Sequence, residues 1–340
     1  MKSSRMILCF FLVAISVAGL AQQYKITNRI SFPGESGWDY LFADSAARIL
    51  YVTHSDRVEV IDLDSQKAIA GITGLNRVHG VAVAADLNRG FISDGGANVV
   101  VVFDTKSRAE LQRVKAGSNP DGIIYDAPSK RVFAFNGSSQ DATVIDASTG
   151  NIAGSIPMGG KPEFPVSDGK GNVFVNVEDK SEILKIDPKA MRVLQHWSVA
   201  PCEEPSGLAM DTAHNRLFSV CSNQKMVVVD ADSGKVVATV PIGKGPDAVV
   251  FDDEKHVAYS SNGQDGTITV IKQESADKYS VVETVATEKS ARTVALDNKT
   301  HNLYLSAAQL GAAPAATADN PHPRPKIVAG SFKVLVVSTQ

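Results

Sequence analysis

A unit of about 42 residues recurs seven times along this chain of 340 residues, and this repeat restricts the fold more than any other feature. In the copy at residues 118–159, four short runs rich in Val, Ile and Phe are separated by Gly, Pro, Asn and Asp. Such runs are typical of β-strands, and the residues between them favour tight turns. Each unit is therefore predicted to be an antiparallel meander of four strands, here called A to D in chain order. One meander cannot bury both of its faces, so the copies must pack against one another.

Two independent markers define the period of the repeat. The first is the position at the start of strand A, which is occupied in the seven units by Asp39, His79, Asp121, Glu163, Ser206, Asp247 and Arg292. These positions are 40, 42, 42, 43, 41 and 45 residues apart. The second marker is an Asp at the end of strand C, found at Asp62, Asp104, Asp146, Asp187 and Asp230 and replaced by Lys272 in the sixth unit. Both markers keep the same spacing, which establishes the repeat.

A period near 42 residues with four strands in each unit is typical of a β-propeller blade. We therefore predict an all-β, seven-bladed β-propeller with four-stranded antiparallel blades. The blades are expected to start near residues 37, 76, 118, 160, 201, 244 and 288, within a single domain of residues 22–340. The last unit ends without a strand D, whereas residues 24–33 resemble the strand D at residues 236–241. The N-terminal strand is thus expected to complete the last blade and close the ring, which removes exposed sheet edges.

Several strand and turn motifs of the repeat are shared with a known group of proteins. They are Tyr51-Val-Thr-His54, the apolar runs that end at Asp62 and Asp146, and the segment 232–243. In these motifs the chain resembles the YncE-like proteins, which are secreted seven-bladed propellers built from YVTN repeats. The motifs consist of strand and turn residues, so the resemblance implies an architecture and leaves the activity open. The chain departs from the repeat pattern at residues 162–165 and at Lys272, and a ligand-specific surface could lie at these two places.

Residues 1–21 have the pattern of a secretory signal peptide. Lys2 and Arg5 precede an apolar run, and small residues follow near the expected cleavage site at Ala21. The run is short for a membrane anchor, although an uncleaved anchor is the alternative. We expect a periplasmic or secreted protein with no membrane span after cleavage. Of the 34 Lys and Arg, 32 would then remain against 37 Asp and Glu, so a nucleic-acid partner is not expected.

Cys202 and Cys221 are the two cysteines of the predicted mature chain. The repeat places Cys202 just before a strand A and Cys221 at the end of the following strand B, which are neighbouring positions in an antiparallel pair. A disulfide is therefore geometrically reasonable in an oxidising compartment. Two unlinked buried thiols, or a functional thiol at Cys221, are the alternatives.

Residues 311–331 interrupt the last unit between strands B and C. This stretch is rich in Pro and Ala and has no strand pattern, so we expect a long loop of extended character. Such a loop could be a mobile surface excursion or a flap over the opening of the ring.

The topology of a propeller brings together residues that lie far apart in the sequence. Strand A lines the central channel, and the loops into strand A and out of strand B open on the same face. The candidate ligand-binding residues on this rim are Asp39, His54, His79, Asp121, Asn136, Glu163, Glu178, Glu204, Asp247, Asn262 and Arg292. Carboxylates that converge in a site of low dielectric repel one another, which favours a bound cation or raised pKa values. The alternative for Asp121 and Asp247 is a structural one, in which the carboxylate caps the turn into strand A.

Two functions are consistent with this rim. The first is a non-catalytic, monomeric scaffold that binds a small polar molecule, a peptide or an envelope protein. The second is a metal-dependent hydrolase (lactonase-like) or lyase, with His79, Glu163 and Glu204 as ligands to Ca²⁺, Mg²⁺ or Zn²⁺. Arg292 could hold a substrate carboxylate or pair with Asp39. The sequence has no nucleophile elbow, zinc-protease motif, Cys-x-x-Cys or phosphate-binding loop, so we favour the non-catalytic function.

Overall fold

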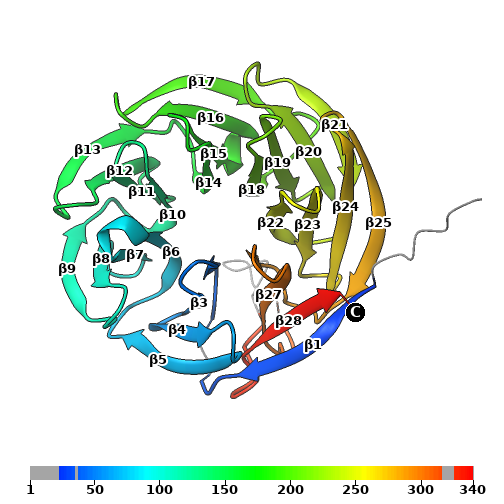
Figure 1. Ribbon diagram of the computed structural model, residues 1–340, viewed down its shortest axis with the longest axis horizontal. Coiled ribbons are helices and arrows are strands. Elements are labelled where there is room, and N and C mark those ends of the chain that lie inside the picture. Colours follow the sequence, from blue (N-terminus) through cyan, green and yellow to red (C-terminus); the bar gives the residue numbers. More distant parts are fainter. Residues whose placement is uncertain (1–22, 35–36, 316–324, 340) are drawn as a thin grey trace, which may run out of the picture.

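The computed structural model describes residues 23–34, 37–315 and 325–339. It contains seven four-stranded antiparallel sheets arranged as blades around a central channel (Figure 1). The predicted seven-bladed propeller is thereby confirmed. The predicted signal peptide lies outside the described residues. Within the described part of the chain, no helix is long and apolar enough to cross a bilayer.

The strands follow the repeat in chain order. Blade 1 consists of β2 (Leu41–Asp44), β3 (Ile49–His54), β4 (Arg57–Asp62) and β5 (Lys67–Thr73). Blade 2 consists of β6 (Val78–Ala84), β7 (Arg89–Asp94), β8 (Val99–Asp104) and β9 (Glu110–Lys115). Blade 3 consists of β10 (Pro120–Asp126), β11 (Arg131–Asn136), β12 (Asp141–Asp146) and β13 (Ile152–Pro157). Blade 4 consists of β14 (Pro162–Ser167), β15 (Val173–Val177), β16 (Glu182–Asp187) and β17 (Arg192–Ser198).

The remaining blades keep this order until the last one. Blade 5 consists of β18 (Pro205–Asp211), β19 (Arg216–Cys221), β20 (Lys225–Asp230) and β21 (Val236–Pro241). Blade 6 consists of β22 (Pro246–Asp252), β23 (Val257–Asn262), β24 (Thr267–Ser275) and β25 (Lys278–Ala286). Blade 7 consists of β26 (Val294–Asp297), β27 (Asn302–Ala307), β28 (Lys333–Thr339) and β1 (Tyr24–Ser31). Two single-turn 3₁₀ helices, η1 (Ala85–Leu87) and η2 (Glu178–Lys180), complete the secondary structure of the described residues.

The ring is closed by the N-terminal strand, as predicted. β1 pairs antiparallel with β28, from Tyr24 opposite Thr339 to Ser31 opposite Lys333, with a bulge at residues 26–28. In Figure 1 the blue β1 lies beside the red β28 on the outer edge of blade 7. The Tyr24 hydroxyl also hydrogen-bonds the Tyr259 hydroxyl of blade 6 at 2.7 Å, so β1 is anchored to the neighbouring blade as well.

Seven apolar cores lie between adjacent blades, one at each junction of the ring. Successive residues of a strand point to opposite faces of its sheet, so the inner strands supply two cores at once. In β11, for example, Phe133 and Phe135 face blade 4, whereas Val132 and Ala134 face blade 2. The near-continuous apolar runs of the sequence are therefore the result of sheets that are buried on both faces.

The Asp at the end of strand C closes the turn into strand D. In blade 3, Oδ1 of Asp146 accepts hydrogen bonds from the backbone N–H groups of Ser148 at 3.0 Å and Thr149 at 2.9 Å. The equivalent bonds are made by Asp62, Asp104, Asp187 and Asp230. Lys272 of blade 6 cannot accept such bonds, and there β24 and β25 continue for several residues before they turn. The departure at Lys272 thus has a structural explanation, a longer hairpin.

The Pro/Ala-rich segment between β27 and β28 has paired flanks. Leu310 forms an isolated antiparallel bridge with Ile327, and the backbone N–H of Val328 donates to the carbonyl of Gln309 at 2.9 Å. The two ends of the predicted loop, residues 311–331, are thus held together by pairing of the backbone beside Leu310 and Ile327. The middle of this loop, residues 316–324, lies outside the described residues.

Candidate functional site

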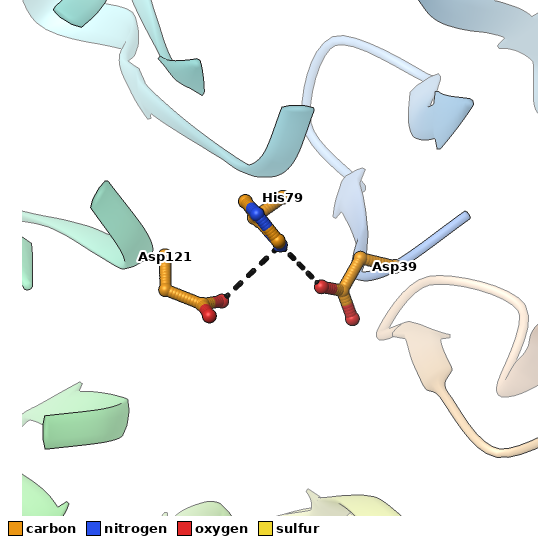
Figure 2. A group of neighbouring side chains, drawn as sticks. All are labelled: Asp39, His79 and Asp121. Carbon is orange, nitrogen blue, oxygen red and sulfur yellow. Dashed lines mark hydrogen bonds and ion pairs between the residues drawn. The ribbon is translucent and has the colours of Figure 1, made fainter. Parts of the chain in front are cut away.

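The start of strand A in blades 1, 2 and 3 supplies a group of three polar side chains at the mouth of the channel (Figure 2). Nδ1 of His79 lies 2.6 Å from Oδ2 of Asp39 and 3.6 Å from Oδ1 of Asp121. All three side chains are largely buried, with at most 16% of each side chain exposed. The imidazole therefore stands between two carboxylates that come from the two neighbouring blades.

Arg292 of blade 7 continues this arrangement around the ring. Its Nε donates to Oδ2 of Asp247 at 2.6 Å, and its Nη2 donates to Oδ1 of Asp39 at 3.3 Å. The same Nη2 donates to the carbonyl of Trp38 at 2.9 Å, and the guanidinium lies over the indole at 5.6 Å from the ring centroid. The pairing of Arg292 with Asp39, one of the two roles considered from the sequence, is present in the structure.

Tyr40 reaches across the channel from blade 1 to blade 4. Its hydroxyl donates to Oε1 of Glu163 at 3.2 Å, and its ring packs edge-on against Phe164 with the centroids 4.8 Å apart. Lys161 approaches the other oxygen of Glu163 at 3.5 Å and also pairs with Glu178. The polar mouth therefore has an aromatic floor made by Tyr40 and Phe164.

Beyond this floor, toward the opposite face, the channel contains a cavity of about 610 Å³. Tyr40 and Phe164 line it together with residues that follow the mouth positions along the A strands. These are mostly apolar and include Phe42, Val81, Val83, Ile123, Val166 and Met210. The channel is thus divided into a charged mouth and a largely apolar interior.

Side chains from the preceding blade hold the mouth residues in place. Oγ of Ser93 donates to the backbone carbonyl of Asp121 at 2.6 Å, and Oγ1 of Thr293 donates to that of Asp39 at 2.9 Å. Each bond crosses a blade junction and fixes the backbone just where the carboxylate leaves it. The mouth is therefore preorganised by contacts between neighbouring blades.

Burial and crowding shift the pKa values of the mouth carboxyls upward. Burial raises the pKa of Asp121 to about 7; the His79 cation moderates this rise and the Asp39 carboxylate adds to it. Burial, followed by the negative charge of Asp121, raises the pKa of Glu163 well above its ordinary value. Burial also raises the pKa of Asp247. Burial alone would lower the pKa of His79. The hydrogen bond to Asp39 and the negative charge of Asp121 outweigh this effect, so the pKa of His79 is raised.

The alternative role of Asp121 and Asp247 as turn caps is not seen. Within the described residues, neither carboxylate accepts a hydrogen bond from a backbone N–H group; Asp247 bonds Arg292, and Oδ1 of Asp121 is buried without a hydrogen-bond partner. Oε2 of Glu163 is likewise buried without a hydrogen-bond partner. The mouth therefore contains two acceptor atoms that lack a hydrogen bond, although Nδ1 of His79 lies 3.6 Å from the first and Nζ of Lys161 lies 3.5 Å from the second.

Three of the candidate residues at the end of strand B make contacts that stabilise the fold. His54 is fully buried, stacks on Phe332 with the centroids 4.0 Å apart, and places Nδ1 3.0 Å from Oε1 of Glu59. Nδ2 of Asn136 donates to Oγ1 of Thr143 at 3.0 Å within blade 3. Asn262 makes the equivalent bond to Thr269 in blade 6. Strand B lies one strand further from the axis than strand A, so its end faces the blade junctions.

The predicted metal-ligand set His79, Glu163 and Glu204 is not brought together. Within the described residues, the group of His, Asp and Glu that could share an ion is Asp39, His79 and Asp121. Glu163 bonds Tyr40 instead, and Glu204 is exposed, with its backbone N–H 3.4 Å from Oγ of Ser181.

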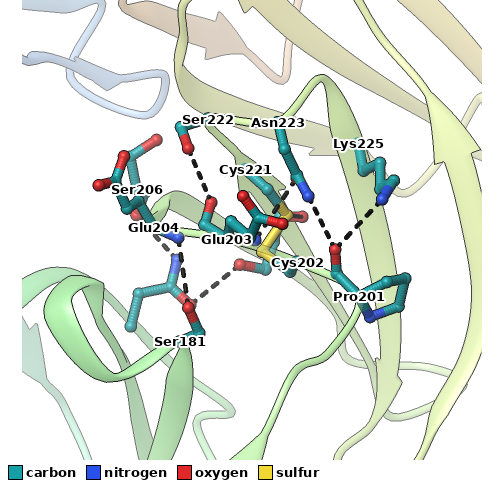
Figure 3. The surroundings of a disulfide bond; sticks show 12 residues. Ser181, Pro201, Cys202, Glu203, Glu204, Ser206, Cys221, Ser222, Asn223 and Lys225 are labelled. Carbon is teal, nitrogen blue, oxygen red and sulfur yellow. Dashed lines mark hydrogen bonds between the residues drawn. A yellow bond between two sulfur atoms is a disulfide. The ribbon is translucent and has the colours of Figure 1, made fainter.

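Glu204 follows a disulfide between Cys202 and Cys221, which has a Cα–Cα distance of 5.4 Å (Figure 3). The backbone N–H of Ser222 also donates to the carbonyl of Glu203 at 2.9 Å. The loop into strand A of blade 5 is thus fastened to the end of strand B of the same blade. The pairing agrees with the positions that the repeat gave to the two cysteines, and it leaves neither as a free thiol.

Tyr40, Phe164 and Lys161 were missed by the sequence reasoning, although the repeat contains a signal for the first two. The residue directly after the first marker is small in the other five blades: Gly80, Gly122, Gly207, Ala248 and Thr293. At Gly122 a Cβ atom would lie 2.2 Å from the carbonyl oxygen of Glu163, so the neighbouring blade excludes a side chain there. Two aromatic residues at a position that is otherwise small are the two that meet across the channel.

The fold and the site define a seven-bladed β-propeller with a polar, carboxylate-rich channel mouth. The chain is 24% identical over 202 residues to the uncharacterized protein YncE of Salmonella typhimurium, a match that spans 58% of this chain and 55% of that relative. The matching region is therefore only about half the length of the relative. Together with the seven blades, this match supports the resemblance to YncE-like propellers.

A solved structure shows the same architecture. The fold is similar to that of a chain of Kuenenia stuttgartiensis hydrazine synthase, with a TM-score of 0.72 and 14% sequence identity, over 87% of this chain and 96% of that chain. At this identity the similarity concerns the fold alone. No protein-family model matches the sequence.

Proposed function

We propose that this protein is a non-catalytic binding protein of the cell envelope or exterior, which holds a small polar ligand with a positively charged hydrogen-bond donor at the channel mouth. The observation that carries this proposal is the pair of buried acceptor atoms, Oδ1 of Asp121 and Oε2 of Glu163, that have no hydrogen-bond partner. An unbonded buried acceptor is costly, by roughly 1–3 kcal/mol for each atom. A ligand that donates to both atoms would remove this cost.

The charge of the mouth also favours a cationic ligand. Five carboxylates, those of Asp39, Asp121, Glu163, Glu178 and Asp247, are accompanied by the cations Arg292 and Lys161 and by the titratable His79. With all five ionised, the mouth is acidic on balance even with His79 protonated; protonation of Glu163, whose pKa is raised, reduces this excess negative charge by one. An ammonium or guanidinium group would reduce the repulsion among the carboxylates, whereas an anion would increase it.

The size of the mouth and its floor favour a small molecule or a single side chain of a peptide. Tyr40 and Phe164 meet across the channel below the carboxylates, so a ligand that arrives from this face would come up against the aromatic pair. A cation that rests on this floor could also lie against the ring faces of the two aromatic residues.

Calorimetric titration in the presence of EDTA tests this proposal with putrescine and arginine, with choline as a cation that has no N–H donor, and with succinate and phosphate as anionic probes. We expect putrescine or arginine to bind at one site per chain, and choline and the anions to bind at least tenfold more weakly. Asp121→Asn and Glu163→Gln should each weaken binding about tenfold, the loss of one charged hydrogen bond.

The matched control is Glu110→Gln on the outer strand β9, where Glu110 pairs with Arg113. This variant should bind the ligand like the wild type. Tighter binding of succinate than of any cation, lost in Arg292→Met, would instead assign the mouth to carboxylate recognition and overturn the proposal.

A further inference from the structure

A second kind of ligand fits one part of the mouth; its site shares Oδ1 of Asp121 with the proposed amine site but is argued from a different group of side chains. Asp39, His79 and Asp121 each offer one ligand atom, and these atoms all lie within 4.8 Å of one another. They come from three successive blades and converge on one point at the mouth (Figure 2). Within the described residues no other His, Cys, Asp and Glu side chains form such a group.

We propose that Asp39, His79 and Asp121 form a site for one divalent transition-metal ion of the zinc class. Oδ1 of Asp121 supplies the second, independent observation: it has no hydrogen-bond partner, although the residue is only 8% exposed. This oxygen lies 3.6 Å from Nδ1 of His79 and thus faces the group. A buried carboxylate oxygen without a donor is stabilised by a cation bound beside it.

The spacing of the three atoms is close to that of a tetrahedral site. Bonds of roughly 2.0–2.2 Å to nitrogen and oxygen at a tetrahedral angle place the two donor atoms about 3.3–3.5 Å apart. The distances from Nδ1 of His79 are 2.6 Å to Asp39 and 3.6 Å to Asp121, on either side of this value. An ion in place of the Nδ1 proton would therefore require Asp39 to move outward by less than about 1 Å and Asp121 to move slightly inward.

The donor set selects the class of metal. One imidazole nitrogen with two carboxylate oxygens suits Zn²⁺ and its neighbours, whereas Ca²⁺ takes six to eight oxygen ligands and Mg²⁺ demands an octahedral oxygen shell. Three protein ligands leave a fourth position open toward the mouth, where a water molecule or a ligand atom would complete the coordination.

The surroundings hold two of the ligands in place. Arg292 donates to Oδ1 of Asp39 at 3.3 Å and leaves Oδ2 directed at His79. The backbones of Asp39 and Asp121 are held by Thr293 and Ser93 of the preceding blades. Outer contacts of this kind orient metal ligands and raise the affinity of a site.

Metal analysis of the untagged protein tests this inference. The protein is dialysed against EDTA and then against buffer that contains Zn²⁺ or Co²⁺. We expect one ion per chain, the visible absorption of four- or five-coordinate Co²⁺, and a melting temperature that rises with Zn²⁺ and returns after chelation. Asp121→Asn and His79→Gln should each weaken Zn²⁺ binding at least tenfold, since each removes one of three ligands.

Two controls separate this site from surface binding and from misfolding. His214→Gln removes a different His–Asp pair, His214 with Asp211 at 2.7 Å, and should leave the stoichiometry at one ion per chain. Asp121→Asn must also unfold cooperatively in EDTA, so that its loss of metal is not a loss of fold. Failure of the wild type to retain Zn²⁺ or Co²⁺, equal retention by Asp121→Asn and His79→Gln, or a preference for Ca²⁺ would each overturn the inference. Because the amine titrations are done in EDTA, either proposal can fail without the other.

Discussion

The hydroxyl of Tyr40 donates to Oε1 of Glu163 at 3.2 Å across the central channel, which joins blade 1 directly to blade 4. Most contacts in a propeller link a blade to its two neighbours, so a bond between blades three places apart is a contact of a different kind. It separates the carboxylates of the mouth from the apolar cavity beyond, and it makes Glu163 part of the floor of the mouth as well as of its rim.

Substitution of Tyr40 should show how much this contact stabilises the ring. Tyr40→Phe removes one buried hydrogen bond and leaves the ring contact with Phe164, so the free energy of unfolding should fall by about 1 kcal/mol. Tyr40→Ala also removes a buried aromatic ring and should cost roughly 3–5 kcal/mol. Urea denaturation measures both values; equal effects of the two variants would show that the ring adds nothing to the hydrogen bond.

Glu163 predicts a dependence of stability on pH. Burial and the charge of Asp121 raise its pKa in the folded state above that of the unfolded chain, so the folded state binds the proton more tightly. The resulting stabilisation is complete below the unfolded pKa, near 4.3, and is lost as the pH rises through the folded pKa. Glu163→Gln should therefore flatten the pH profile and unfold at a higher urea concentration than the wild type at pH 8.

The measurement for Glu163→Gln is a series of urea titrations in EDTA between pH 4 and pH 8. Glu110→Gln, on the outer strand of blade 2, serves as the control and should follow the wild-type profile. A wild-type stability that rises over this range, with Glu163→Gln parallel to it, would contradict the assignment of this carboxyl as a buried acid.

The disulfide between Cys202 and Cys221 should stabilise the protein measurably. It closes a loop with a sequence separation of 19, for which the loss of chain entropy in the unfolded state corresponds to about 3 kcal/mol. The double variant Cys202→Ala and Cys221→Ala should be less stable by roughly 2–4 kcal/mol in urea. Dithiothreitol should lower the stability of the wild type toward that of the variant and leave the variant unchanged; a wild type that is insensitive to dithiothreitol would argue against the contribution of the bond.

Strand β1 should be required for a stable ring. A chain that starts after Phe32 loses the last strand of blade 7 and three buried side chains, Tyr24, Ile30 and Phe32. Each of these contributes roughly 1.5–3 kcal/mol when it is buried, so the truncated chain should lose at least about 5 kcal/mol of stability. A synthetic peptide of residues 24–32 should pair with β28 and restore the melting temperature, whereas the same peptide with Ile30→Asp should not. Cooperative unfolding of the truncated chain at the wild-type temperature would refute this role.

The fold could be predicted from the sequence because its determinants are local and repeated. The Asp at the end of strand C, as at Asp146, marks the turn into strand D in five blades by the bonds it makes to its own turn. The closure of the ring by residues 24–31 was also predictable. The last unit lacks a strand D, and the N-terminal segment resembles a strand D that belongs to no other unit, so the one completes the other. Seven copies of one pattern gave several independent observations of each position.

The site was predictable only in part, because it depends on the direction of side chains at one position of the repeat. The start of strand A does bring Asp39, His79 and Asp121 together, as the topology required. The end of strand B, at His54 and Asn136, carries equally polar residues, yet these face the blade junctions. Polarity alone does not distinguish a side chain that hydrogen-bonds at a blade junction from one that faces the channel, so the two sets looked alike in the sequence.

The pairing of β1 with β28 has a consequence for synthesis of the chain. Among the strands of the ring, β1 is synthesised before all the others and its partner β28 after all of them. β1 therefore has no partner strand until β28 has been made, and until then the array of blades has an open sheet edge. A chaperone that shields a lone strand would be most useful to this protein up to that moment.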